Sequence, residues 1–295
     1  MRFFRFTVLV IFALLAACST GKQTTQLAQN ASLAFMAGDY AQALEHYETF
    51  IFQHGNNPLV IPDSIYRGAG LAAFELDQPS KALDYLNTIR HSEAADAPVQ
   101  YAMALLNRQI DNLSREITAL EHYVTNFPQG EHHVAMQLRL FEVWVESQNY
   151  QDAVALWPSV EPHASAQESY VQGYFIAQQA LGNEDELDAL ADQLLNLNRN
   201  NTLALFHLGK KHFWLAENRY RSEMQAYENN RTHRQYAQLL RAFDVLNADF
   251  RKSLDFFLKL WEIDPRPEYA RFIGNIYTRF EDRPKARYFL ERSGQ

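Results

Sequence analysis

The chain has little of what disulfide-rich or sheet-rich domains depend on. It contains a single cysteine, Cys18, so no disulfide can form within it. Glycine is scarce, at 11 of 295 residues, and the hairpin-turn pair Asn-Gly is absent, which disfavours sheet. Leu, Ala, Gln, Glu and Arg are frequent instead, a composition that favours helix. No segment stays apolar for about 18 residues, so no membrane-spanning helix is expected.

The common catalytic and metal-binding motifs are also missing. The sequence has no G-x-S-x-G, H-E-x-x-H, G-x-x-x-x-G-K or C-x-x-C. His132 and His133 are adjacent, so on a helix they point about 100° apart, and His207 and His212 miss the four-residue spacing that aligns ligands. We therefore predict no catalytic residue, no metal and no cofactor. A hydrolase with an unrecognised site remains the enzymatic alternative.

The first 18 residues have the pattern of a secretory leader. A basic start, Met1 to Arg5, precedes an apolar stretch, Phe6 to Leu15, that is too short to span a bilayer. Leu15-Ala16-Ala17-Cys18 then resembles the bacterial lipobox. The resemblance implies that residues 1–17 are a signal peptide, that Cys18 carries acyl chains after cleavage, and that 18–26 form a short linker. An ordinary cleaved leader, or a free thiol, is the alternative.

The lipobox resemblance also implies a location. Ser19 follows the cysteine where an aspartate would imply retention in the inner membrane, so transfer to the outer membrane is expected. The segment from Ser19 to Gln26 has no acidic residue, which favours the periplasmic face. Such a compartment contains almost no nucleic acid, so we predict no nucleic-acid partner and a membrane contact only through lipid.

Charge is unevenly distributed along the chain. Residues 19–206 carry 8 Lys and Arg against 23 Asp and Glu, whereas residues 207–295 carry 17 against 12. This asymmetry creates a long-range field that can orient a partner. An acidic or phosphate-rich partner is therefore expected at the C-terminal end. Contact between copies of the chain, or a solvated surface with no specific partner, is the alternative.

A repeat of about 34 residues runs through the sequence. Small or aliphatic residues recur at an equivalent place in each unit, and they are Ala43, Ala82, Ala119, Ala153, Leu187, Ser253 and Ala286. The step from Leu187 to Ser253 is close to two units, which predicts one degenerate repeat between them. Large residues such as Tyr47 and Trp157 follow four positions after the small ones, a small-against-large pattern that lets paired helices pack closely.

The pattern resembles the tetratricopeptide repeat (TPR), a helix–turn–helix unit of 34 residues. The resemblance implies an all-α fold, an α/α superhelix of about seven to eight helical hairpins. Residues 27–202 are expected to form an acidic TPR array, 203–248 a degenerate repeat with lengthened helices, and 249–295 basic C-terminal TPR units. Because no proline or glycine occurs between Lys210 and Asp264, we predict long helices over 203–229 and 232–247.

The TPR resemblance also implies a concave groove lined by the first helix of each hairpin. The positions that carry over are Arg67, Leu71 and Phe74 in the second repeat, Tyr101 and Arg108 in the third, Glu142 in the fourth, and Arg271, Asn275 and Arg279 in the last. Arg271 and Asn275 lie four residues apart and share a helix face. An arginine beside an asparagine amide can hold a carboxylate.

Two stretches, residues 216–232 and 275–280, resemble TPR lipoproteins of the Bacteroidetes type, and Tyr123 to Gly130 resembles repeat endings of periplasmic assembly factors. The leading hypothesis is a non-enzymatic, membrane-anchored scaffold that binds other envelope proteins in outer-membrane assembly or maintenance. The alternative is a periplasmic binding protein for peptidoglycan, glycan or lipid.

Overall fold

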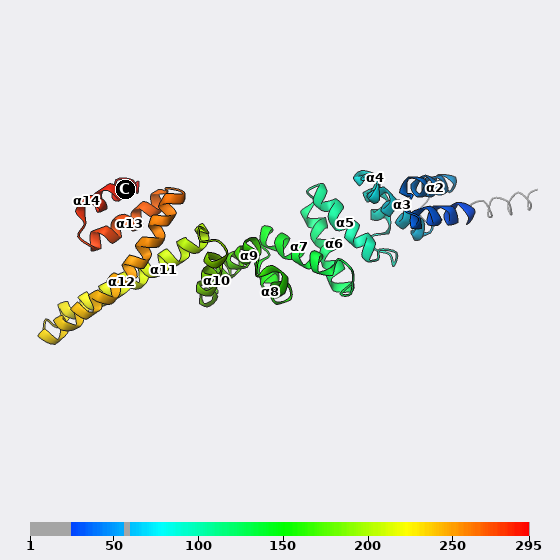
Figure 1. The fold of residues 1–295 in the computed structure, drawn as a ribbon. Coiled ribbons are helices and arrows are strands. Elements are labelled where there is room, and N and C mark those ends of the chain that lie inside the picture. The colour runs from blue at the N-terminus through cyan, green and yellow to red at the C-terminus, as the bar shows by residue number, and fades with distance from the viewer. Residues whose placement is uncertain (1–24, 56–59, 295) are drawn as a thin grey trace, which may run out of the picture. The chain divides into compact units, whose positions relative to one another are not determined.

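The fold consists of helices paired into hairpins (Figure 1). The computed structural model describes residues 25–55 and 60–294, so Cys18, the signal peptide and most of the expected linker lie outside the described residues. Within those ranges the chain forms fourteen helices and no strand. The predicted all-α, TPR-like fold class is therefore confirmed. The chain divides into two compact units, residues 1–143 and 144–295.

The first unit begins with a helix over residues 25–36. Its later helices are α2 (Tyr40–Gln53), α3 (Asp63–Glu75), α4 (Pro79–Ile89), α5 (Ala97–Gln109), α6 (Leu113–Asn126) and most of α7 (His133–Glu146). Helices α3 and α4 pack as one hairpin, and α5 and α6 pack as the next.

The second unit continues the same alternation. Its helices are α8 (Tyr150–Ala164), α9 (Glu168–Ala180), α10 (Glu184–Leu197), α11 (Thr202–Asn229), α12 (His233–Ile263), α13 (Pro267–Arg279) and α14 (Arg283–Leu290). The pairs α9/α10, α11/α12 and α13/α14 pack as hairpins.

The turns inside the hairpins share one backbone conformation. Six of them place a single residue in the left-handed region, and these residues are Gly38, Asp77, Asp111, Gln148, Gly182 and Glu281. The next residue donates its backbone N–H to the carbonyl five positions earlier, as Asp282 does to Tyr277 at 3.0 Å, which is the Schellman arrangement. That same residue begins the second helix, and Asp39, Asn112 and Asp282 cap it by accepting a backbone N–H.

The small positions of the repeat bring paired helices close together. Ala43, Ala82 and Ala153 are fully buried. In two hairpins the close approach is so tight that a Cβ on the first helix would overlap a leucine on the second, namely Gly70 against Leu86 and Gly274 against Leu290. These two pairs are each 16 residues apart in sequence, so they occupy the same place in their repeats. The small-against-large packing that the sequence predicts is confirmed.

The long helix predicted over 203–229 is present as α11. It pairs with α12 in a single hairpin, so no additional repeat lies between Leu187 and Ser253, and α12 runs without a break to Ile263, past the predicted end near 247. The boundary expected at 248/249 therefore falls inside a helix. The physical reason is that buried apolar positions continue at helical spacing through Leu246, Phe250 and Phe257, and no stop signal occurs before Asp264 and Pro265.

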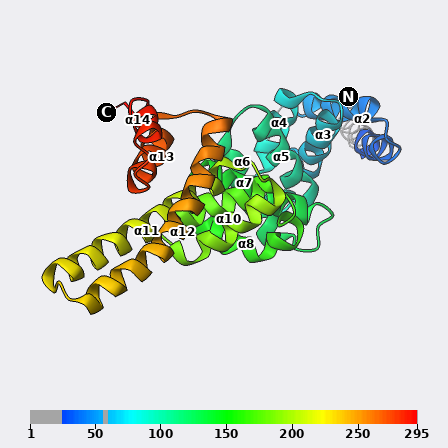
Figure 2. The same cartoon turned by 60° about the vertical axis from the view of Figure 1, so that its left-hand side comes forward.

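The base of the α11/α12 hairpin is an ordinary repeat. The Ser253 hydroxyl donates to the Gly209 carbonyl at 2.8 Å, and Gly209 faces the Phe257 ring. The extra residues lengthen both helices beyond this base, and we call residues 218–245 the arm. Figures 1 and 2 show the tip of the arm, in yellow, extending past α13 and α14.

Candidate functional site

Most of the groove residues predicted in α3 make contacts within the fold. The Arg67 guanidinium binds the Asp96 carboxylate at 2.7 and 3.0 Å, and the same carboxylate caps α5 by accepting the Val99 N–H at 3.4 Å. Leu71 is buried and lines no groove, because its position on α3 faces the core of the repeat. Arg67 is thus a link between two hairpins rather than an open cation.

Aromatic residues of the expected groove do come together. The Phe74 ring meets the Tyr101 ring edge-on at 6.4 Å, and Tyr101 stacks on His132 at 3.9 Å. All three side chains are half-buried, while Arg108 on the same helix as Tyr101 is exposed. These side chains of the predicted groove therefore remain partly accessible in the first unit.

Glu142 belongs to an ion-pair network. Arg139 binds Glu142 at 3.0 Å and also binds Glu116 at 2.7 Å. The Glu116 side chain is only 3% exposed, so the Arg139 charge offsets a carboxylate that α6 buries. Glu142 extends this network toward the surface.

The C-terminal residues divide into two kinds. Arg271 and Asn275 are exposed on α13, as the sequence predicts for groove positions. The guanidinium of Arg279, on the same helix, is already paired within the fold. Its guanidinium binds the carboxylate of Glu217 on α11 at 2.7 and 2.9 Å. The sequence gives no sign of this pairing.

Aromatic pairs hold α11 and α12 together as an antiparallel pair, from the base of the hairpin out along the arm. Phe213 packs on Phe250 at 5.9 Å, Tyr220 on Phe243 at 6.1 Å, and Tyr227 on Tyr236 at 5.8 Å. Each step moves seven residues out along α11 and seven back along α12. That spacing is the heptad period of a coiled coil, so the helices remain paired to their ends.

A buried ion pair braces the arm against α13. The Glu217 side chain is 7% exposed and accepts from both Arg279 and Arg221, the latter at 3.0 Å. Burial alone would raise the pKa of the Glu217 carboxyl, but the hydrogen bonds and charges of Arg279 and Arg221 outweigh burial and lower the pKa below its ordinary 4.5. Glu217 is therefore a charged carboxylate at neutral pH.

The Arg279 side chain also packs on an aromatic face. Its guanidinium lies 4.0 Å from the centre of the Tyr220 ring, within the range of a cation–π interaction. Two different contacts thus hold the last turn of α13 against the base of the arm.

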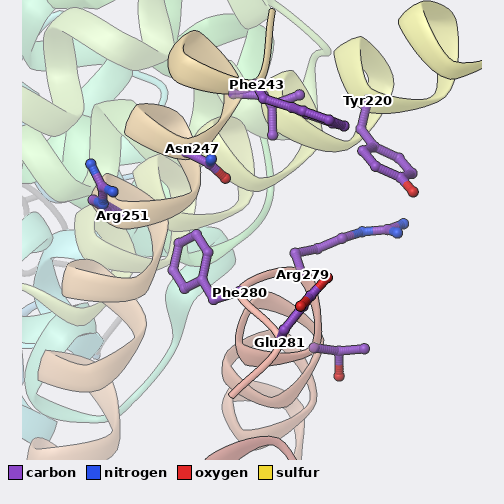
Figure 3. Close-up of a pocket in the computed structure, with 9 residues that line it drawn as sticks. Tyr220, Phe243, Asn247, Arg251, Arg279, Phe280 and Glu281 are labelled. Carbon is purple, nitrogen blue, oxygen red and sulfur yellow. The ribbon is translucent and has the colours of Figure 1, made fainter. Parts of the chain in front are cut away.

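A cleft of about 640 Å³ opens beside this brace, and we call it the root cleft (Figure 3). The residues that line it are Tyr220, Phe243, Leu246, Asn247, Arg251, Thr278, Arg279, Phe280 and Glu281. Asn247 and Arg251 come from α12, whereas the last four come from the end of α13 and the turn after it. Figure 3 shows the Arg279 side chain reaching toward Tyr220 and the Phe280 ring lying near α12.

Several polar side chains of the root cleft are left without a partner among the described residues. In the part of the chain that the structure describes, Asn247 and Arg251 make no side-chain hydrogen bond or ion pair. Arg251 is exposed and Asn247 is half-buried. An unpaired guanidinium and amide neither transfer protons near neutral pH nor act as nucleophiles, but both can donate hydrogen bonds to a bound group.

A second charged cluster lies where α10 meets α11. The Asp188 carboxylate binds the His207 ring nitrogen at 2.9 Å and also pairs with Lys211. Burial would raise the pKa of Asp188, but hydrogen bonds from Lys211 and His207 outweigh it and lower the pKa. His212 pairs instead with Asp249, at 3.0 Å, so the two histidines serve different contacts.

The described helices offer neither a metal cluster nor a membrane span. No group of three or more His, Cys, Asp or Glu side chains in residues 25–55 and 60–294 lies close enough to hold a metal ion. In the same ranges, no helix is both long and apolar enough to cross a bilayer.

Comparison with known proteins shows the fold class. No protein-family model matches the chain, and no curated protein matches it. Among solved structures, a protein from Bacteroides ovatus ATCC 8483 described as protein-binding is 18% identical, with a TM-score of 0.50 over 75% of this chain and 99% of that one. A tetratricopeptide repeat protein from Parabacteroides merdae ATCC 43184 is 11% identical, with a TM-score of 0.41 over 92% and 93% of the two chains. At 18% identity the likeness to the Bacteroides ovatus protein shows an all-α fold of stacked helical hairpins and nothing finer.

Proposed function

We propose that this chain is a lipid-anchored scaffold that binds other proteins of the bacterial envelope. Lipid on Cys18 holds it at the outer membrane on the periplasmic side, and its helical hairpins present recognition surfaces without chemistry of their own. The proposal rests on the lipobox at Leu15 to Cys18, on the TPR-like fold and on the arm.

The arm is the observation that carries the proposal. Helical repeats need only short turns to stack, so a lengthened hairpin adds nothing that the stack requires. Here the extra length exposes large apolar side chains to solvent, including Tyr236, Leu240 and Val245, which are 46–48% exposed. Exposed apolar side chains on a braced element are typical of a protein-binding surface.

The membrane part of the proposal has a direct test. Cells of the bacterium that encodes the chain are grown with an alkyne analogue of palmitate, and the protein is isolated and probed for label. We expect label on the wild type, none on Cys18→Ser, and wild-type protein in the outer-membrane fraction. A wild-type protein that is unlabelled, or that fractionates as a soluble protein, contradicts the anchor.

The scaffold part is tested by crosslinking in the intact envelope, followed by recovery of the protein. The wild type is compared with an arm-shortened variant in which a short Gly-Ser turn replaces residues 221–242. We expect the wild type to recover a specific protein in near-stoichiometric amount and the variant to recover much less. Circular dichroism must show that the variant keeps its helical hairpins. Recovery of glycan or lipid without protein overturns the scaffold in favour of the ligand-binding alternative.

A further inference from the structure

The root cleft has the chemistry to recognise one kind of protein segment. We propose that it binds a partner segment that presents an Asp or Glu carboxylate next to an aromatic or branched aliphatic side chain. This inference rests on the proposed scaffold function and names the chemistry of its partner. The carboxylate binds Arg251 and Asn247, and the apolar side chain packs on the rings of Phe243 and Phe280.

The polar group of the partner is inferred from which side chains of the cleft already have hydrogen-bond partners. Arg279 is occupied by Glu217, and the Thr278 hydroxyl donates to the Gly274 carbonyl at 2.9 Å. Asn247 and Arg251 remain, four residues apart on α12 and so on one helix face. Asp255, one turn further along, is exposed and makes no ion pair with Arg251 within the described residues. A guanidinium and an amide both donate hydrogen bonds, so they call for an anionic acceptor.

The charge of Glu281 determines which class of anion the cleft favours. Glu281 lines the same cleft, and its backbone takes the left-handed conformation at φ 59°. Among the described residues, the charged groups of the cleft without a partner therefore carry one positive charge, on Arg251, and one negative charge, on Glu281. Glu281 repels any anion, and it repels a phosphate with two negative charges more strongly than a single carboxylate. A single carboxylate is balanced by Arg251, and the Glu281 carboxylate can accept a backbone N–H from the same peptide segment.

The apolar part follows from the rings. Tyr220 and Phe243 stack with their planes only 24° apart, and Phe280 meets Phe250 edge-on at 6.3 Å. Tyr220, Phe243 and Phe280 are half-buried, while Leu246 beneath them is buried. A bound apolar side chain would remove the remaining exposed faces of these rings from water.

The brace makes the cleft ready for binding. The Glu217–Arg279 ion pair and the Arg279–Tyr220 stack fix the end of α13 against the arm. A site whose walls are already fixed loses little conformational entropy on binding. The surrounding charge adds a second argument, because residues 207–295 carry five more basic than acidic side chains and attract an acidic segment.

The test uses the full lipidated chain in nanodiscs and three fluorescent peptides. Each peptide has acetyl and amide ends and Gly-Ser flanks around one central pair: Phe-Asp, Phe-Asn or Ala-Asp. Fluorescence anisotropy measures the Kd. We expect the wild type to bind the Phe-Asp peptide about tenfold or more tightly than Phe-Asn, because a charge-assisted pair is lost, and more tightly than Ala-Asp.

Arg251→Gln and Lys252→Gln form a matched pair of variants. Both remove one positive charge from exposed positions of α12, but only Arg251 lines the cleft. We expect Arg251→Gln to lose the preference for Phe-Asp over Phe-Asn and Lys252→Gln to keep it within about twofold, since coupling is specific to groups in contact.

The results that overturn the inference differ from those that overturn the scaffold. Equal binding of the Phe-Asp and Phe-Asn peptides by the wild type rejects the cleft, as do equal effects of the two variants. If the crosslinked partner is still recovered, the scaffold function stands. Self-association of the chain that Arg251→Gln abolishes would assign the cleft to the acidic half of a second copy and overturn its assignment to another protein.

Discussion

Glu217 on α11 and Arg279 at the end of α13 lie 62 positions apart in sequence and 2.7 Å apart in the fold. The carboxylate is buried, and the guanidinium that binds it also lies over the Tyr220 ring. Removing one member leaves the other charge without compensation, whereas removing both leaves an apolar contact. Removing one member of a buried pair generally lowers the free energy of unfolding strongly, whereas replacing both by apolar residues often leaves it nearly unchanged.

We therefore predict that Arg279→Met destabilises the second unit by about 2–3 kcal/mol, less than the roughly 3–5 kcal/mol typical of breaking a fully buried pair. The Arg279 side chain is 33% exposed and Arg221 still contacts Glu217, and both facts limit the loss. The double variant Glu217→Met with Arg279→Met should recover most of that stability. Urea unfolding followed by tryptophan fluorescence measures both.

Tryptophan fluorescence is selective here because all four tryptophans, residues 144, 157, 214 and 261, lie in the second unit. A double variant that is as unstable as Arg279→Met alone would contradict the prediction. It would mean that the pair is needed for its geometry and not only for its charge balance.

The same carboxylate predicts acid sensitivity. Its pKa is lowered in the folded state, so folding favours the ionised form. This stabilisation is fully present above the ordinary pKa of 4.5 and is lost as the pH falls through the lower folded value. The lowered pKa of Asp188 acts in the same direction below its ordinary 3.8.

Glu217→Gln should therefore be less stable than the wild type at pH 7 and should lose less further stability between pH 5 and pH 3, a range set by those ordinary values. Thermal unfolding followed by tryptophan fluorescence across this range tests it. Glu228→Gln removes the same charge from an exposed position of α11 and serves as the control. Equal pH profiles for Glu217→Gln and the wild type would exclude Glu217 as the titrating group.

The sequence predicts the hairpins well because helical packing leaves a periodic trace. Ala43, Ala82 and Ala153 recur at repeat spacing, and each proves to be buried between paired helices. Between Leu187 and Ser253 the absence of proline and glycine correctly predicts the long α11, but the anchor spacing also predicts an additional repeat that the structure does not have. A lengthened hairpin and an extra repeat add similar numbers of residues, so the spacing cannot distinguish them.

The candidate site is less visible in the sequence. The TPR resemblance places Arg279 among the groove positions of the last repeat. It does not tell that α11 and α13 lie close enough for Glu217 to bind that guanidinium. Arg67 illustrates the same limit, because its partner Asp96 lies in the loop before α5, where helical periodicity gives no information.

The sequence also does not reveal the left-handed turn residues, because only two of the six are glycine. Gln148 holds φ at 63°, a conformation that costs a residue with a side chain about 1–2 kcal/mol. Gln148→Gly should stabilise the second unit by about 0.5–1 kcal/mol, the difference between relieved strain and the greater freedom of glycine when unfolded.

The reverse change at the equivalent turn is the matched control. Gly182 has φ at 75° and open space around its Cα, so Gly182→Gln should destabilise by a similar amount without a clash. Both variants are read by urea unfolding. If Gln148→Gly destabilises, the turn must depend on a side-chain contact of Gln148 rather than on its backbone conformation.

Substitutions at the base of the α11/α12 hairpin should destabilise the fold much more than substitutions at the tip of the arm. Phe250 is fully buried and packs on Phe213 and Phe280, whereas Tyr236 near the tip is 48% exposed and packs on Tyr227. Phe250→Ala should cost about 3–5 kcal/mol, as for a buried aromatic, and Tyr236→Ala less than about 1 kcal/mol, because little of its surface is buried. Urea unfolding measures both costs, and hydrogen exchange should be faster at residues 224–240 than at 246–260. Equal costs at the two sites would mean that the tip is part of the cooperative core. A low cost at the tip leaves its exposed side chains free to change without loss of the fold, as a partner-binding surface requires.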